Sequence, residues 1–359
     1  MDSESSLPFH VVVLGAGVIG LQTALTLLEK GIKVTIVSKF WAKDRHPSYT
    51  SIWSGAQWRS TDDLDDLRQQ DWDYQTFIHW SELVKKHTPE ELGVELRPAV
   101  FYWDHLTPEA MSPEKSKWWS SLVPTFTVLP RESMPSGSNF AVGVSYSTYS
   151  VSPPLYLSYL LRSCEALGAD CVNLDVKSIP ELMRQPGFTD IHGVVNCTGL
   201  GARDLVGDKA CFPTKGQTLI VKGSAHRLST RSGDGWEALV IPRPGANETL
   251  LGGCKIPRDW STLPDAAITE MIVERCRPLA PELLDDQGCF EIQAIHVGLR
   301  PSREGGTRVD LELLDQLTKD GRPKFVCHNY GHHSAGYEGS VGAANAASKL
   351  VMDYLKEDL

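Results

Sequence analysis

The strongest pattern of hydrophobic positions lies near the start of the chain. Residues 10–14, HVVVL, form a short apolar run that predicts a strand. A glycine-rich segment follows over residues 15–20, and residues 21–31 continue with the apolar spacing of a helix. Residues 33–37 predict a second strand directly afterwards. The pattern therefore predicts a strand–turn–helix–strand unit.

The rest of the chain carries further helical and extended patterns. Helices are predicted over residues 64–86, 88–91, 152–168, 265–276 and 339–355. Strands are predicted over residues 94–104, 170–176, 193–196, 215–221, 238–245, 248–253, 291–299 and 324–328. Residues 238–245 and 248–253 form a predicted hairpin, whereas the proline- and serine-rich residues 105–150 predict loops and short strands. The predicted fold class is α/β (α+β overall), with a Rossmann-like lobe and a second lobe built on a mainly antiparallel sheet.

Composition and charge exclude several classes of protein. The 359 residues are 41% hydrophobic, which suits a two-lobed globular protein, and 35 basic against 45 acidic residues give a net charge of -10. No basic run with interleaved aromatic residues occurs, so nucleic acid is not expected as a partner. The eight cysteines are scattered without a CxxC, which indicates a reducing compartment. Neither a signal peptide nor a membrane span is predicted, so we expect a soluble intracellular protein.

Each glycine of the first turn has a separate physical role. Gly15 permits the tight turn, Gly17 lets the backbone approach a pyrophosphate, and Gly20 lets the helix pack closely on the strand. The helix N-terminus then offers free N–H groups to an anion, so the unit predicts dinucleotide binding. A standard fingerprint has an acidic residue after the second strand, but here that position holds Ser38 and Lys39. The motif alone therefore does not separate FAD from NAD.

Two other segments are expected to approach the dinucleotide. Residues 43–58 predict an extended loop over it, and residues 196–201, NCTGLG, form a second glycine turn after a strand. No second GxGxxG occurs, which speaks against a separate nicotinamide dinucleotide and favours electrons from an organic substrate. His328, His332 and His333 lack acidic or cysteine companions at ligand spacing, so no metal site is predicted.

Seven segments, in chain order, resemble the D-amino-acid oxidase and D-aspartate oxidase family. They are VVLGAGVIGLQTAL, SIWSGAQW, VVNCTGLGA, IPRPG, LLGGCKIPRDW, VGLRPSREGG and HNYGHHSAGYEGSVGAA. The resemblance covers essentially the full chain, and it implies a two-lobed flavoenzyme in which one FAD lies extended on the glycine-turn lobe. The implied domains are a discontinuous FAD-binding domain over residues 1–90, 150–210 and 295–359 and a substrate-binding domain over residues 91–149 and 211–294.

Carried onto matching positions, the resemblance assigns the main roles at the site. Arg300 in VGLRP corresponds to the arginine that binds the substrate α-carboxylate, a contact that guanidinium makes in bidentate geometry. Ser334 stands where the family uses a backbone carbonyl to hold the substrate amine. The implied cofactor-binding residues are Gly15, Ala16, Gly17, Val18, Ile19, Gly20, Ser38, Lys39, Ser51, Gly55, Ala56, Gln57, Val176, Thr198, Gly199, Gly201, Arg300, Ser334, Ala335, Gly336, Tyr337 and Glu338.

The positions that would set substrate specificity depart from the family pattern. Leu239 stands where a tyrosine usually shares the α-carboxylate, and Trp236 is a candidate substitute. Arg231, in the segment STRSGDGW, lies close to where D-aspartate oxidases carry an arginine for the side-chain carboxylate. Further candidates for substrate contact are Arg243, Arg97 and Gln57.

The resemblance implies oxidative deamination of D-amino acids. The substrate α-hydrogen would pass as hydride to FAD, the imino acid would hydrolyse to a 2-oxo acid and ammonia, and O2 would reoxidise the flavin to hydrogen peroxide. The arginine candidates favour acidic substrates, as in a D-aspartate oxidase, whereas IPRPG also suits neutral ones. A glycine or sarcosine oxidase, an NAD-linked dehydrogenase and a non-enzymatic flavin-binding protein are the alternatives.

The resemblance also bears on location and assembly. The family implies a peroxisomal protein, although the chain ends in Lys-Glu-Asp-Leu and not in Ser-Lys-Leu; the cytoplasm is the alternative. A homo-oligomer is left open.

Overall fold

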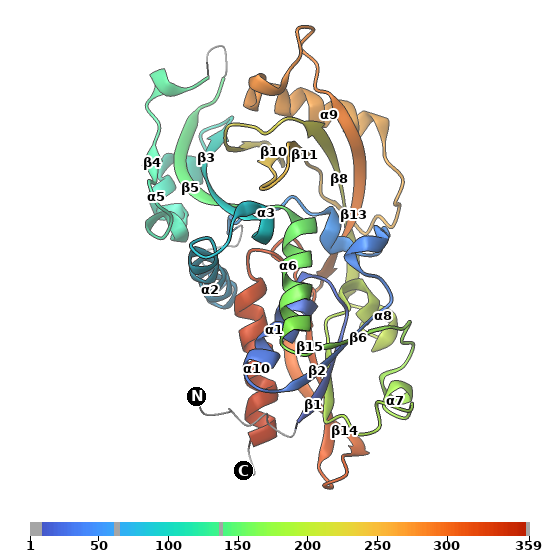
Figure 1. Cartoon of the computed structure of the whole chain (residues 1–359). Helices are drawn as coiled ribbons and strands as arrows, with labels where there is room; N and C mark the ends of the chain where they lie inside the picture. Colours follow the sequence, from blue (N-terminus) through green and yellow to red (C-terminus); the bar gives the residue numbers. More distant parts are fainter. Residues whose placement is uncertain (1–8, 61–64, 136–138, 357–359) are drawn as a thin grey trace.

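The computed structural model of the protein describes residues 9–60, 65–135 and 139–356. Two β-sheets organise this part of the chain, one in the lower and one in the upper half of Figure 1. The N-terminal segment and the C-terminal tail, from which targeting was predicted, lie outside the described residues, as does residue 64 at the start of a predicted helix. Within the described residues, no helix has the length and apolar character needed to cross a membrane.

The lower sheet is the predicted Rossmann-like unit. Its six strands lie in the order β14-β15-β7-β1-β2-β6, and all neighbours pair in parallel except β14 with β15. The strands are β1 (His10–Leu14), β2 (Lys33–Ser38), β6 (Asp170–Asn173), β7 (Gly193–Asn196), β14 (Arg308–Leu317) and β15 (Pro323–Tyr330). Only β14 was not predicted, although Val309, Leu311 and Leu313 alternate with charged residues along it; it is an edge strand without a fully buried residue.

Helices cover both faces of this sheet. Val11 and Val13 of β1 pack in one apolar cluster with helix α1, whereas Val12 and Leu14 pack in another with Ile179. The first face carries α1 (Val18–Glu29), α2 (Leu67–Leu83), α6 (Pro153–Ala166) and α10 (Ser340–Lys356), and the second carries α7 (Ile179–Leu182). Burial on both faces explains why the parallel strands read as continuous apolar runs.

The upper sheet has nine strands and is mainly antiparallel, as predicted. Only β3 and β9 pair in parallel in this sheet, as far as its described strands show. The strands are β3 (Val94–Trp103), β4 (Thr127–Val128), β5 (Val142–Val151), β8 (Cys211–Lys222), β9 (Leu228–Gly233), β10 (Trp236–Pro242), β11 (Glu248–Gly252), β12 (Ile256–Pro257) and β13 (Ile292–Arg303). The remaining helices are α3 (Pro89–Leu92), α4 (Pro108–Met111), α5 (Pro113–Ser116), α8 (Ala202–Leu205) and α9 (Ala266–Cys276).

Two longer strands of the upper sheet differ from the sequence prediction, and the two-residue β12 was not predicted either. β5 has ten residues, although serine-rich SYSTYS predicted only loops and short strands; it is held by full pairing with β3. β9 was not among the predicted strands, and it pairs with β3 on one side and β10 on the other. In both cases tertiary pairing overrides a weak local preference. The boundaries of the two proposed domains stay a prediction.

Close packing of α10 on α2 gives a first test of the fold. A Cβ atom placed on Gly342 of α10 would lie 2.2 Å from the Cα atom of Trp72 in α2. We therefore expect Gly342→Ala to lower the free energy of unfolding by about 1–3 kcal/mol, although alanine is the better helix former by roughly 1 kcal/mol. Equilibrium unfolding in urea measures the change. The control Ala346→Ser, at a half-buried position of α10, should change little; a stabilised Gly342→Ala variant would contradict this packing.

Candidate active site

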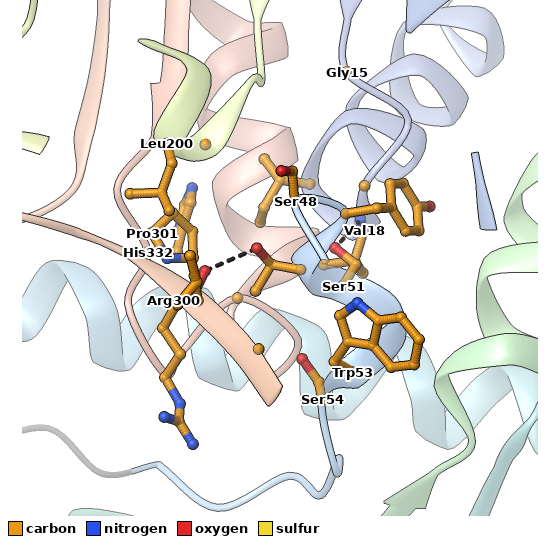
Figure 2. A pocket seen from close by; sticks show the side chains of 18 of the residues that line it. Gly15, Val18, Ser48, Ser51, Trp53, Ser54, Leu200, Arg300, Pro301 and His332 are labelled. Carbon is orange, nitrogen blue, oxygen red and sulfur yellow. Dashed lines mark hydrogen bonds between the residues drawn. The ribbon is translucent and has the colours of Figure 1, made fainter. Parts of the chain in front are cut away.

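A cavity of about 780 Å³ is lined by residues from both sheets. Its volume lies within the roughly 300–1,000 Å³ typical of small-molecule and cofactor sites. The lower wall begins at the turn between β1 and α1, and the upper wall includes residues of β10 and β11. Figure 2 shows Gly15, Val18 and Ser51 on one side of this cavity and Leu200, Pro301 and Arg300 on the other.

The first glycine turn has the predicted geometry. Gly15 has a φ of 102°, a left-handed conformation that glycine adopts without strain, and its N–H donates to the carbonyl of Val37 at 2.8 Å. A Cβ atom on Gly20 would lie 1.8 Å from the carbonyl oxygen of Gly15, so only glycine lets α1 approach the turn this closely. Gly20 itself does not line the cavity; its role is this packing.

The N-terminus of α1 opens onto the cavity. Gly17 is the N-cap residue with an extended backbone and contributes no capping side chain. The N–H of Val18 donates to the hydroxyl of Ser51 at 3.0 Å, and a Cβ atom on Gly17 would lie 2.9 Å from that oxygen. Because free N–H groups and the helix dipole attract negative charge, this end of α1 suits a pyrophosphate.

The end of β2 lacks the usual carboxylate, and a neighbouring strand supplies one. The hydroxyl of Ser38 accepts a bond from Ala16 N–H at 3.2 Å and donates to the carbonyl of Phe40 at 2.7 Å. Lys39 forms an ion pair with Asp175 at 2.8 Å, just beyond strand β6. Since β6 runs parallel to β2, Asp175 lies at the same edge of the sheet and lines the cavity with Ser38 and Lys39.

The opposite wall joins the second glycine turn to β13. Gly199 has a φ of 57°, and a Cβ atom there would contact Pro301 at 3.4 Å. The carbonyl of Pro301 accepts the N–H of His333 at 3.0 Å, which fixes the loop that contains Ser334. Further along this loop, the hydroxyl of Tyr337 donates to the carbonyl of Ser51 at 2.9 Å. The 331–338 loop is thereby tied to both walls of the cavity.

Arg300 places a positive charge in the cavity without an acidic partner. Its Nη1 donates to the carbonyl of Cys254 at 3.2 Å, and among the described residues it forms no ion pair. A Cβ atom on Gly216 of the paired strand β8 would lie 2.3 Å from Nη1, so this glycine makes room for the guanidinium. Burial lowers the pKa of the half-buried Arg300. An anionic ligand would supply the missing counter-charge.

The histidines of the 331–338 loop add no positive charge at neutral pH. Burial, and then the positive charges of Arg300 and Lys255, lower the pKa of His333 to about 4. Burial and the charge of Arg68 lower the pKa of His332 to about 3, and its Nε2 lies 2.9 Å from the amide oxygen of Asn329. Both rings are therefore neutral at pH 7.

One group of potential metal ligands lies outside the cavity. One ligand atom each of Asp310, Glu312 and His328 lies within 4.8 Å of the others. Arg308 forms ion pairs with both carboxylates, at 3.0 Å for Asp310 and closer for Glu312. A guanidinium already neutralises the two acids, so the arrangement fits an ion-pair network better than a cation site.

Most residues predicted for the cofactor line the cavity. They are Gly15, Ala16, Gly17, Val18, Ile19, Ser38, Lys39, Ser51, Gly55, Ala56, Gln57, Val176, Thr198, Gly199, Gly201, Arg300, Ser334, Gly336, Tyr337 and Glu338. Of the predicted substrate contacts, Leu239 and Gln57 line it as well. The buried Ala335 does not, although the neighbouring Ser334 and Gly336 do.

Four residues predicted to contact the substrate do not line the cavity. Arg231 and Trp236 point to the other face of the upper sheet, because Arg231 pairs with Ala238 of β10 while Thr230 pairs with the cavity-lining Leu239. There Arg231 forms an ion pair with Asp104 at 2.8 Å and lies over the ring of Trp236. The strand register, which STRSGDGW did not reveal, decides this placement.

The two remaining arginines have structural partners. Arg243 is buried, pairs with Glu248 at 2.9 Å, and donates to the carbonyls of Ser54 and Gly55 at 3.3 Å each. It therefore holds the loop that lines the cavity without reaching the cavity itself. Arg97 donates to the hydroxyl of Ser224 at 3.2 Å and lies outside the cavity.

Among the charged residues of the cavity wall that sequence reasoning missed, three form a cluster. Arg59, Glu237 and Lys255 line the cavity, and Arg59 pairs with Glu237 at 3.0 Å. Their separation along the chain gives no local signal. Lys255 lies within the segment LLGGCKIPRDW, which the resemblance had marked, so the motif itself was the available hint.

Comparisons with known proteins agree on the family. The family model described as "FAD dependent oxidoreductase" (DAO) matches residues 10–350. A D-amino-acid oxidase of Schizosaccharomyces pombe is 30% identical over 362 residues, with 99% of each chain covered. A D-aspartate oxidase of Talaromyces thermophilus is 31% identical over 372 residues, with 96% of each chain covered.

Solved structures show the same fold. A glycine oxidase from Bacillus cereus superposes with a TM-score of 0.73 at 17% identity, covering 96% of this chain and 95% of that one. An L-α-glycerophosphate oxidase from Mycoplasma pneumoniae, with FAD bound, gives a TM-score of 0.74 at 15% identity, covering 96% and 94%. The glycine cradle, the open N-terminus of α1 and the volume of the cavity all fit FAD. The chain belongs to the DAO family of FAD-dependent oxidoreductases.

Proposed function

We infer that this FAD-dependent enzyme oxidises D-amino acids to 2-oxo acids, with release of ammonia and hydrogen peroxide. The observation that carries this proposal is Arg300, a guanidinium without an acidic partner among the described residues, in the cavity that also holds the dinucleotide turn. The two curated relatives, one named a D-amino-acid oxidase and the other a D-aspartate oxidase, support the substrate class.

The residues of the chain would bind and orient the substrate. When bound, FAD would supply the acceptor for the hydrogen of the substrate Cα atom and the path for its electrons to O2. Arg300 would hold the α-carboxylate through two parallel N–H bonds, which fixes both position and orientation. The loop at Ser334 would hold the amine, and the neutral ring of His333 beside it adds no repelling charge. Leu239, Ile241 and Leu250 give the cavity an apolar wall that excludes water.

The alternatives differ in what the cavity would bind. The glycine oxidase resembles this chain in fold only, at 17% identity, and glycine or N-methylglycine would leave the charged wall at Arg59 and Lys255 without a ligand. A substrate panel that includes both compounds separates these activities. A peroxisomal location and a homo-oligomer stay predictions from the resemblance.

The proposal predicts a specific loss of substrate binding when Arg300 is removed. We expect Arg300→Ala to remain yellow with bound FAD, because its guanidinium is proposed to bind substrate, while the KM for D-amino acids rises about 100-fold or more. Steady-state peroxide production over a D-amino-acid series measures this. Arg97→Ala, at a half-buried arginine outside the cavity, is the matched control and should leave KM within about twofold. Unchanged kinetics in Arg300→Ala would contradict the assignment.

A second prediction concerns the adenosine end of the cofactor. A carboxylate usually binds the ribose hydroxyls, and Asp175 is the acidic side chain that lines the cavity next to Ser38 and Lys39. We expect Asp175→Asn to weaken FAD binding to the apoprotein about tenfold, since an amide replaces a charged acceptor. Fluorescence titration with FAD measures the affinity directly.

The control for this prediction is another lysine-paired aspartate. Asp190 is paired with Lys319 at 2.6 Å and does not line the cavity, so Asp190→Asn should bind FAD normally. Equal FAD affinity in wild type and Asp175→Asn would show that this carboxylate does not contact the ribose.

A further inference from the structure

Arg59, Glu237 and Lys255 form a charged cluster in the wall of the cavity that contains Arg300. The Nη2 of Arg59 lies 3.0 Å from Oε2 of Glu237, and the Nζ of Lys255 lies 4.0 Å from the same oxygen. One carboxylate is therefore shared by two cations. The cluster keeps one unit of positive charge in excess.

The upper sheet places these side chains in the cavity. Along β10, Glu237, Leu239 and Ile241 line the cavity, and alternate residues of a strand face the same side. Arg59 lies beside the ring of Phe101 of β3, with its guanidinium carbon 5.0 Å from the ring centroid. Lys255 stands between β11 and β12, so its position follows from the strand that pairs with β10.

The cluster contains a hydrogen-bond donor without a partner in the ranges that the structure describes, as well as an uncompensated positive charge. Arg59 is only 5% exposed, and its Nε has no hydrogen-bond partner among the described residues. Such an unsatisfied buried donor is unusual in folded proteins and often marks a functional site. Lys255 is 50% exposed and provides the accessible ammonium group of the cluster.

The charges around Lys255 favour an anion at this point. Burial lowers its pKa most, Glu237 raises it, Arg59 and Arg300 lower it, and Glu338 raises it slightly. Glu338 lies just before α10, whose N-terminus partly compensates its negative charge. Because Arg300 would be neutralised by the substrate α-carboxylate, Lys255 and Arg59 remain to bind a second negative group.

We propose that Arg59, Glu237 and Lys255 form the subsite for the substrate side chain, and that this subsite selects D-amino acids whose side chains end in a carboxylate. Lys255 contacts this carboxylate, Arg59 adds positive charge behind it, and Glu237 is a positioning residue that holds the two cations in place. This inference rests on the proposed function. It replaces Arg231, Arg243 and Arg97, which lie outside the cavity, as the determinants of specificity for acidic substrates.

The alternative occupant is a neutral side chain. Leu239, Ile241 and Leu250 also line the cavity and would pack against an aliphatic group. In that case the charges of Arg59 and Lys255 would have no counterpart on the substrate. D-Aspartate and D-alanine therefore distinguish the two readings, since they share the α-carboxylate and amine and differ in the side chain.

The first experiment compares kcat/KM for D-aspartate and D-alanine in the FAD-loaded enzyme. The wild type should prefer D-aspartate, and Lys255→Met should lower the ratio about 10- to 100-fold, the worth of one charge-assisted hydrogen bond. Lys222→Met is the matched control, because Lys222 is paired with Glu291 at the surface and does not line the cavity. Titration of the flavin absorbance with malonate, a dicarboxylate that is not oxidised, should show the same loss of affinity without turnover.

A pH profile tests the role of Glu237. Lys255 loses its proton as pH rises, so the ratio of kcat/KM for D-aspartate to kcat/KM for D-alanine should fall at alkaline pH. Glu237→Gln removes a negative charge that raises the pKa of Lys255, so the fall should begin at lower pH. His333, which also faces Lys255, has a pKa of about 4 and does not titrate in that range. The amine of the substrate titrates for both compounds and cancels in the ratio.

The outcomes separate this inference from the proposed function. If no D-amino acid bleaches the flavin without oxygen, the proposed function is wrong. If D-alanine is oxidised but preferred over D-aspartate, or if Lys255→Met leaves both the ratio and the malonate affinity unchanged, the side-chain subsite is wrong while the oxidase activity stands. An identical pH profile in Glu237→Gln would overturn the positioning role alone.

Discussion

The site depends on a guanidinium that the protein holds in a cavity and does not neutralise. A charge removed from water is costly unless an opposite charge or hydrogen bonds compensate it. Arg300 has one carbonyl contact, to Cys254, and among the described residues it has no carboxylate partner. The strand pairing of β13 with β8, and the absence of a side chain at Gly216, keep it there. A fold that keeps such a charge near a dinucleotide cradle is suited to an anionic substrate.

Some arginines of this protein are paired with a carboxylate and hold the structure together, whereas Arg300 has no such partner in the described part of the chain and is available to a ligand. Arg243 is paired with Glu248 and donates hydrogen bonds to two carbonyls. Its charge is therefore compensated within the protein, and it holds a loop in place. Arg231 is likewise paired, on the far face of the sheet. Arg300 lacks such a partner, and the pair formed by Arg59 and Glu237 is shared with Lys255. Residue type alone therefore does not identify a binding arginine; the face of the strand and the counter-charge do.

Features of the site that depend on neighbouring residues could be predicted from the sequence, whereas features that depend on the tertiary fold could not. Local signals sufficed for the turn, because Gly15, Gly17 and Gly20 act through backbone geometry within a few residues of one another. Arg300 was predicted from the motif that surrounds it in the chain, and it lines the cavity. The face on which Arg231 lies could not be predicted, because it depends on the register of β9 with β10. Arg59, Glu237 and Lys255 meet only through the tertiary fold, so no spacing could reveal them.

The chain lacks the acidic residue of the dinucleotide fingerprint at the end of β2, and the sheet places another acidic residue nearby. Ser38 occupies its position and uses its hydroxyl to bind the glycine turn and Phe40. The neighbouring parallel strand then places Asp175 at the same edge, where it pairs with Lys39. Parallel strands bring their carboxyl ends together, so an acidic side chain absent from the end of one strand can stand at the end of the next.

A crystal structure of the FAD-bound enzyme with malonate tests the central claim most directly. If Arg300 and Lys255 are the two anchors of a dicarboxylic substrate, one carboxylate should lie against the guanidinium of Arg300 and the other against the ammonium of Lys255. Malonate bound away from Arg300, or Arg300 paired with a protein carboxylate in the holoenzyme, would contradict it.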